Sequence, residues 1–177
     1  MENIINKIKA FDQVEGSILI SGFRKGEKPI AVLTAMKNKG IKSRDFTIVD
    51  TFENSPWQLA YDFCNEVKNR VKKNGTYLKT DLETVKLDIL PSIVIIDHNS
   101  VEMCYKLIRK YLIESSDKAM IICTNTSISV VEINKLTPSG FKKSTTIQLP
   151  TKEVVIVKEK SDLDKIKTPV RTRSVLT

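Results

Sequence analysis

Residues 91–97, which read Pro-Ser-Ile-Val-Ile-Ile-Asp, constrain the fold more than any other segment of the chain. Four consecutive β-branched residues, Ile93 to Ile96, make both sides of this segment apolar, as in a central strand of a parallel sheet covered on both faces. Similar apolar runs at 17–22, 45–50 and 119–124 alternate with segments of helical apolar spacing at 4–11, 30–39, 56–79 and 100–114, the third of which is broken at Gly75. This alternation predicts an α/β fold with a mainly parallel sheet and helices on both faces.

The rest of the chain predicts one domain followed by a tail. Shorter strands are expected at 145–148 and 153–157, and a short helix at 81–90. Residues 158–177 lack apolar periodicity and are rich in Lys and Arg. We therefore expect a single α/β domain over 1–157 and a basic, flexible tail over 158–177.

Composition favours a soluble cytoplasmic protein without a metal. No apolar run approaches the roughly 18 residues of a membrane helix, and the start lacks the apolar core of a signal peptide. The three cysteines, Cys64, Cys104 and Cys123, lie among apolar neighbours without a CxxC pair, and the chain has one histidine. We expect reduced, buried thiols and no metal site.

The net charge of +8 predicts an anionic partner. Nucleic acid is the partner that the charge favours, with protein subunits of an assembly as further partners and no membrane contact. A solvated lysine-rich surface is the alternative interpretation of the same charge. The candidate nucleic-acid contacts are basic residues around the end of the third expected helix and in the tail: Lys68, Arg70, Lys72, Lys73, Lys79, Arg171 and Arg173.

Three polar segments follow strands of the predicted sheet. They are the loop 22–28, the pair Asp97–His98, and residues 124–126. Because ligands of α/β sheets bind at the carboxyl ends of the strands, these segments predict the site. Asp97 and His98 are the candidate catalytic residues, although Asp97 could equally cap the next helix and His98 could be an ordinary loop residue.

The order of these elements resembles a P-loop NTPase of the AAA+ or RecA-like type. Gly22 and Lys28 stand at the first glycine and the lysine of GxxxxGK[ST], Asp97 at the Walker B aspartate, and Asn125 at a sensor position. The resemblance implies nucleotide binding by Gly22, Gly26, Lys28 and Asn125. The sequence departs from the family pattern at three positions. Glu27 replaces the second glycine, Pro29 replaces the Ser or Thr whose hydroxyl binds Mg²⁺, and His98 replaces the catalytic acid.

These departures predict a degenerate domain that does not hydrolyse nucleotide. The favoured function is a non-catalytic accessory protein acting on nucleic acid in replication, recombination or packaging. The alternatives are a scaffold protein of a larger assembly and an atypical ATP hydrolase. No cofactor is expected, with ATP as the alternative.

Overall fold

The structure is a computed structural model that describes residues 2–11, 16–24, 26–38, 45–53, 58, 61–62, 65, 75–136 and 144–158. Its helices and strands, in chain order, are α1 (Glu2–Ala10), β1 (Ser17–Ser21), α2 (Glu27–Asn38), β2 (Phe46–Asp50), β3 (Gly75–Lys79), β4 (Pro91–Ile96), α4 (Val101–Ile113), β5 (Ala119–Cys123), α5 (Val130–Leu136), β6 (Ser144–Gln148) and β7 (Val154–Lys158).

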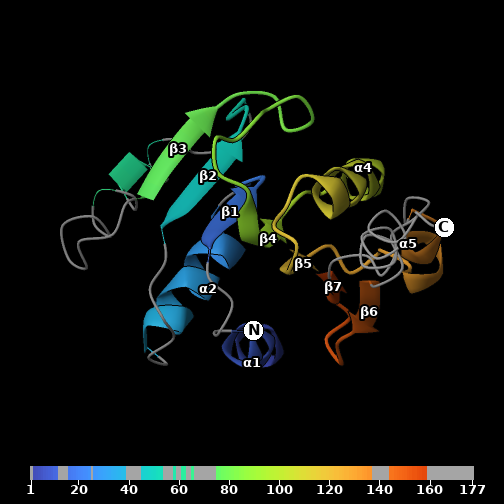
Figure 1. The fold of residues 1–177 in the computed structure, drawn as a ribbon. Coiled ribbons are helices and arrows are strands. Elements are labelled where there is room, and N and C mark those ends of the chain that lie inside the picture. Colours follow the sequence, from blue (N-terminus) through green and yellow to red (C-terminus); the bar gives the residue numbers. More distant parts are fainter. Residues whose placement is uncertain are drawn as a thin grey trace, which may run out of the picture.

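The seven strands form one sheet in the order β3-β2-β1-β4-β5-β7-β6 (Figure 1). The first five strands in this order are mutually parallel, and β7 runs antiparallel between β5 and β6. The predicted mainly parallel sheet is therefore confirmed. The last two strands were predicted without a position in the sheet. β3 was not predicted, because Gly75–Lys79 lies in the segment expected to end the third helix.

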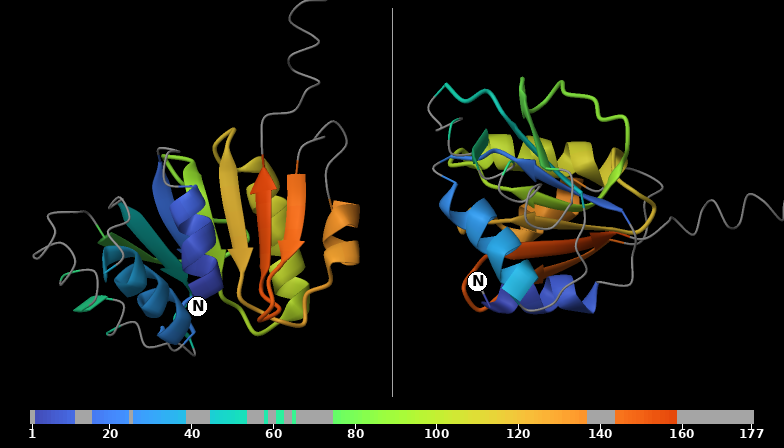
Figure 2. Two further views of the ribbon diagram at one scale, coloured as in Figure 1. Left: turned by 90° about the horizontal axis from the view of Figure 1, so that it is seen from below. Right: turned by 90° about the vertical axis from the view of Figure 1, so that its left-hand side faces the viewer.

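Helices cover both faces of the sheet, as predicted (Figure 2). On one face, Ile5 and Ile8 of α1 and Val32 of α2 pack on a layer of strand side chains that includes Ile95. On the other face, α4 packs on alternate strand residues such as Val94. All six residues of β4 are buried, because β4 lies in the middle of the sheet and has helices on both sides.

The segment between β3 and β4 differs from its prediction. Residues 81–90 form turns instead of a short helix, and the Asp81 carboxylate accepts hydrogen bonds from the backbone N–H groups of Glu83 (2.7 Å) and Thr84 (3.2 Å). An Asp side chain that bonds to the backbone in this way stabilises a turn. The segment borders a cavity of about 360 Å³, lined in part by Thr47, Thr76, Leu78 and Leu87.

The predicted start of the tail lies at the last residue of β7. Lys158 was assigned to the tail, but it is the last residue of β7 and is 5% exposed. Its Nζ donates hydrogen bonds to the carbonyl (3.2 Å) and the hydroxyl (3.1 Å) of Ser115. Residues 159–177, which contain the rest of the predicted tail, lie outside the described residues. No described helix is long and apolar enough to cross a membrane.

Candidate functional site

The sheet has a topological switch point between β1 and β4. β1 pairs with β2 on one side and with β4 on the other. The chain leaves β1 for α2 on one face of the sheet and leaves β4 for α4 on the opposite face (Figure 1). In α/β proteins, ligands bind at the carboxyl ends of the strands beside such a switch point.

The loop after β1 is held close to β4 by a glycine. Gly22 has φ +92°, and a Cβ placed on it would lie 2.4 Å from the carbonyl oxygen of Asp97. Its N–H donates to the carbonyl of Val49 (2.8 Å). Only glycine combines this dihedral angle with so close an approach of two backbone segments. Gly22 therefore determines how closely the ends of β1, β2 and β4 meet.

Asp50, the last residue of β2, fixes the same loop from its other side. One carboxylate oxygen accepts a hydrogen bond from the Phe23 N–H (2.6 Å) and a longer one from the Arg24 N–H (3.4 Å). The other oxygen accepts from the Phe52 N–H (3.2 Å). Asp50 is 9% exposed. Asp50 was not among the residues predicted from the sequence. It lies at the end of a buried strand, which is the pattern that pointed to Asp97.

An aromatic cluster lies beside Asp50. The Phe52 ring is 6.1 Å from the Phe23 ring and 6.1 Å from the Tyr77 ring, and Tyr61 packs edge-on against Tyr77 at 5.7 Å. Phe52 and Phe23 are buried, whereas Tyr61 is 42% exposed. The cluster gives the end of β2 and its neighbour β3 an apolar aromatic wall.

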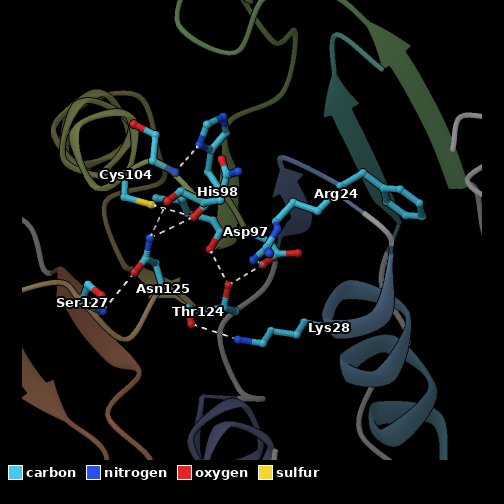
Figure 3. A network of polar contacts seen from close by, with 12 residues as sticks. Arg24, Lys28, Asp97, His98, Cys104, Thr124, Asn125 and Ser127 are labelled. Carbon is cyan, nitrogen blue, oxygen red and sulfur yellow. Dashed lines mark hydrogen bonds and ion pairs between the residues drawn. The ribbon is translucent and has the colours of Figure 1, made fainter. Parts of the chain in front are cut away.

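Asp97, directly after β4, is the centre of a polar network (Figure 3). Its Oδ1 lies 2.6 Å from the Thr124 hydroxyl and 3.7 Å from the Arg24 guanidinium. Asp97 is 2% exposed, and this burial raises the pKa of its carboxyl even though Thr124 and Arg24 oppose the shift. The Asp97 carboxylate thus links the loops that follow β1, β4 and β5.

His98 and Asn125 connect the loops after β4 and β5. The Asn125 side-chain amide donates to the carbonyls of His98 (3.2 Å) and Asn99 (3.3 Å), and its oxygen accepts from the Ser127 N–H (2.9 Å). Burial lowers the pKa of His98. The backbone N–H of Ser100, the cap of α4, donates to His98 Nδ1 at 2.9 Å.

Two thiols lie beneath these loops. Cys104 and Cys123 are free and fully buried, as the sequence predicts, whereas Cys64 lies outside the described residues. The Cys104 thiol donates to the His98 carbonyl at 3.3 Å. The hydrogen bond between the two thiols lowers the pKa of Cys104 and raises the pKa of Cys123.

The loop 22–28, of which every residue except Lys25 is described, contains the residues that match the P-loop pattern. Lys28 Nζ donates to the Thr124 carbonyl (3.1 Å), and Glu27 is an exposed residue at the start of α2. Gly26, at φ +78°, faces the Phe23 ring, which a Cβ would approach to 2.5 Å. The residues that match the P-loop pattern therefore make contacts within the protein.

The structure brings four of the predicted site residues to one edge, Lys28, Asp97, His98 and Asn125 (Figure 3). Gly22 lies against the Asp97 carbonyl at the same edge. Among the predicted nucleic-acid contacts, only Lys79 is described. It is exposed at the end of β3. The others, Lys68, Arg70, Lys72, Lys73, Arg171 and Arg173, lie outside the described residues.

No protein-family model and no curated protein sequence matches this chain. Solved structures do match. They include the S-adenosylmethionine-dependent methyltransferase SibL in its apo form (13% identity, TM-score 0.60, covering 90% of this chain and 54% of that one). An rRNA methylase from Streptococcus thermophilus has 13% identity and TM-score 0.54, covering 83% and 87%. Magnesium protoporphyrin IX methyltransferase from Synechocystis PCC 6803 with bound SAM has 11% identity and TM-score 0.55, covering 89% and 77%.

This chain spans between 54% and 59% of three of the methyltransferases that it matches. At these identities the likeness concerns the fold, and it corrects the interpretation as a P-loop NTPase. P-loop NTPases and methyltransferases share a similar order of strands and loops along the sequence. They differ in the order of the strands within the sheet, which only the three-dimensional structure shows.

Two functional expectations fall with the P-loop interpretation. The similar structures are methyltransferases, so the expectation of a non-catalytic P-loop accessory protein is wrong. Neither the scaffold alternative nor the ATP-hydrolase alternative gains support from these structures. The expectation of no cofactor, with ATP as the alternative, is also corrected, because similar structures contain SAM or S-adenosylhomocysteine. The chain has the three-layer, Rossmann-like α/β fold of class I S-adenosylmethionine-dependent methyltransferases.

Proposed function

We propose that this chain binds S-adenosylmethionine at the carboxyl ends of β1, β2 and β4 and transfers its methyl group to an acceptor molecule. The observation that carries this proposal is the position of Asp50 at the carboxyl end of β2, the strand next to the switch point between β1 and β4. Its carboxylate lies against the loop after β1, with the Phe23 N–H at 2.6 Å. In dinucleotide-binding sheets, an acidic residue downstream of the first loop binds the ribose hydroxyls.

The residues at this edge fit the chemistry of S-adenosylmethionine. The Asp50 carboxylate would accept hydrogen bonds from the two ribose hydroxyls, and the aromatic cluster beside it would hold the purine. The guanidinium of Arg24, whose side chain is 48% exposed, would pair with the carboxylate of the amino-acid end. When bound, the cofactor supplies a methyl group on a positively charged sulfur.

The polar network around Asp97 would keep this binding edge in place. Thr124, Arg24 and Asp97 join three loops through contacts of 2.6 and 3.7 Å, and Asn125 fixes the backbone after β4. A site that is held rigidly orients the acceptor toward the methyl group, which lowers the entropic cost of the reaction.

The acceptor is proposed to be anionic. Two of the similar structures carry rRNA methylase in their names, and this chain has a net charge of +8. Positive charge attracts nucleic acid through its phosphates. RNA is therefore the first acceptor to test.

Calorimetric titration with S-adenosylhomocysteine tests cofactor binding without requiring the acceptor. We expect the unaltered protein to bind it and Asp50→Asn to weaken binding by about ten- to a hundredfold, since hydrogen bonds to a charged group contribute about 1.5–3 kcal/mol. Asp45→Asn makes the same chemical change at the opposite end of β2 and serves as the matched control. It should bind like the unaltered protein.

Two results would overturn the proposal. One is no heat of binding with S-adenosylhomocysteine up to millimolar concentration while the protein is folded by circular dichroism. The other is equal weakening by the Asp50 and Asp45 substitutions, because then the effect would not depend on the carboxyl end of the strand.

A further inference from the structure

The imidazole of His98 is held in one tautomer by the backbone. The Ser100 N–H lies 2.9 Å from His98 Nδ1. A backbone N–H can only donate, so Nδ1 must act as the acceptor and carry no proton. The proton of the neutral ring is therefore on Nε2, and Nε2 is a hydrogen-bond donor.

Two features make this arrangement stable. Ser100 is the N-cap of α4, with φ −86° and ψ 120°, and its hydroxyl accepts a hydrogen bond from the Met103 N–H (3.2 Å). The His98 carbonyl accepts from Asn125 (3.2 Å) and from the Cys104 thiol (3.3 Å). The backbone on both sides of the imidazole is thus fixed, and the ring cannot exchange its tautomer without losing the Ser100 bond.

The charges around His98 belong to the candidate site. Asp50 and Asp97 favour the protonated ring, and Arg24 opposes it. Burial is the largest influence, and the net result is a pKa below the ordinary value of 6.5. At neutral pH the ring is therefore uncharged, and its Nδ1 bond to Ser100 is retained.

We infer that His98 donates a hydrogen bond from Nε2 to an oxygen atom of the methyl-accepting substrate, which keeps a second lone pair, and does not act as a general base. This inference rests on the proposed function. In the transfer, a lone pair of the substrate forms the bond to the methyl carbon. The sulfur–carbon bond breaks with its electron pair moving to sulfur, and any proton that the substrate loses goes to water.

The tautomer can be measured in the protein alone, because His98 is the only histidine of the chain. Two-bond ¹H–¹⁵N correlation spectra should show a protonated Nε2 and a titration midpoint below 6.5. Ser100→Pro removes the N–H donor and should raise the midpoint and mix the two tautomers. Ser100→Ala also removes the capping hydroxyl but keeps the N–H, so it should leave the titration midpoint and the tautomer of His98 unchanged. A protonated Nδ1, or identical spectra for the two variants, would overturn the inference; if Ser100→Pro does not fold, the spectrum of the unaltered protein still decides.

The substrate contact is tested by transfer of labelled methyl groups from S-adenosylmethionine to total bacterial RNA and to a low-mass cell extract. His98→Gln keeps an N–H donor near the position of Nε2 but cannot serve as a base, whereas His98→Ala has neither property. We expect His98→Gln to retain at least about a tenth of the rate and His98→Ala to lose more than tenfold, mainly through KM. Equal loss in both variants would contradict the donor role. No transfer by the unaltered protein would overturn the proposed function and the substrate contact, whereas the tautomer result would stand.

Discussion

Substituting Gly22 by alanine tests whether the ends of β1 and β4 must meet as closely as the structure shows. Two costs add. A non-glycine residue at φ +92° is strained by about 1–3 kcal/mol. The new Cβ would also lie 2.4 Å from the Asp97 carbonyl oxygen and 3.1 Å from its carbon, so the two backbones must separate. This separation would weaken the hydrogen bond from the Asp97 N–H to the Ser21 carbonyl, now 3.1 Å, at a cost of about 1 kcal/mol.

We therefore expect Gly22→Ala to lower the free energy of unfolding by about 2–4 kcal/mol, measured by urea denaturation. For a domain of this size, the melting temperature should fall by about 5–15 °C. Gly26→Ala is the comparison, because Gly26 also has a positive φ (+78°) but its Cβ would meet the Phe23 and Ile30 side chains, not backbone. It should be the milder change. A loss below about 1 kcal/mol for Gly22→Ala would refute the close approach of the strands.

Two further predictions concern the core and the buried carboxyl. Ile95→Ala should lower the free energy of unfolding in urea denaturation by about 2–5 kcal/mol, because Ile95 is fully buried in the central strand. Ile89 is 71% exposed, so Ile89→Ala should change stability by about 0.5 kcal/mol or less. Similar losses at both positions would contradict the burial of Ile95. The pKa of Asp97 is raised in the folded state above the ordinary 3.8, so the stability of the unaltered protein relative to Asp97→Asn should fall as pH rises from below about 4 and become constant once Asp97 is ionised in both states. A relative stability that instead rises with pH in urea melts would mean that the carboxylate is stabilised in the fold.

Local pattern was sufficient to predict six of the seven strands and the covering of the sheet, but it did not predict β3 (Gly75–Lys79). Runs of β-branched residues such as Ile93 to Ile96 can be stable only where both faces are buried, and the structure places them there. Local sequence patterns do not determine the order of the strands within the sheet. The position of β7 between β5 and β6 depends on pairings such as Ile121 with Ile156, which lie far apart in the sequence.

The sequence predicts that the candidate site residues share one edge of the sheet, but it does not predict their contacts. Asp97, His98 and Asn125 do lie together, since the carboxyl ends of parallel strands share one edge. The spacing of Gly22 and Lys28 suggested a phosphate loop, but the Lys28 amine reaches the Thr124 carbonyl instead. The direction of a long side chain depends on its three-dimensional surroundings, and no motif spacing reports it.

The turn at residues 81–90 was missed for a different reason. The segment was expected to be a short helix, but the Asp81 carboxylate binds the backbone N–H groups of Glu83 and Thr84. An Asp with free N–H groups two and three residues later is compatible with both a turn and a helix start. The tertiary packing, which the sequence pattern does not show, decides between them.

The most direct test of the proposed function is to locate the site at which the chain would bind S-adenosylmethionine. Its product S-adenosylhomocysteine can be titrated into ¹⁵N-labelled protein, with ATP–Mg²⁺ as the comparison ligand, while amide chemical shifts are followed. We predict shifts at residues 22–24, 50–52 and 97–99 with S-adenosylhomocysteine, and none of this pattern with ATP–Mg²⁺. No shifts, shifts confined to the cavity beside Thr47 and Leu87, or the same pattern with both ligands would contradict the account.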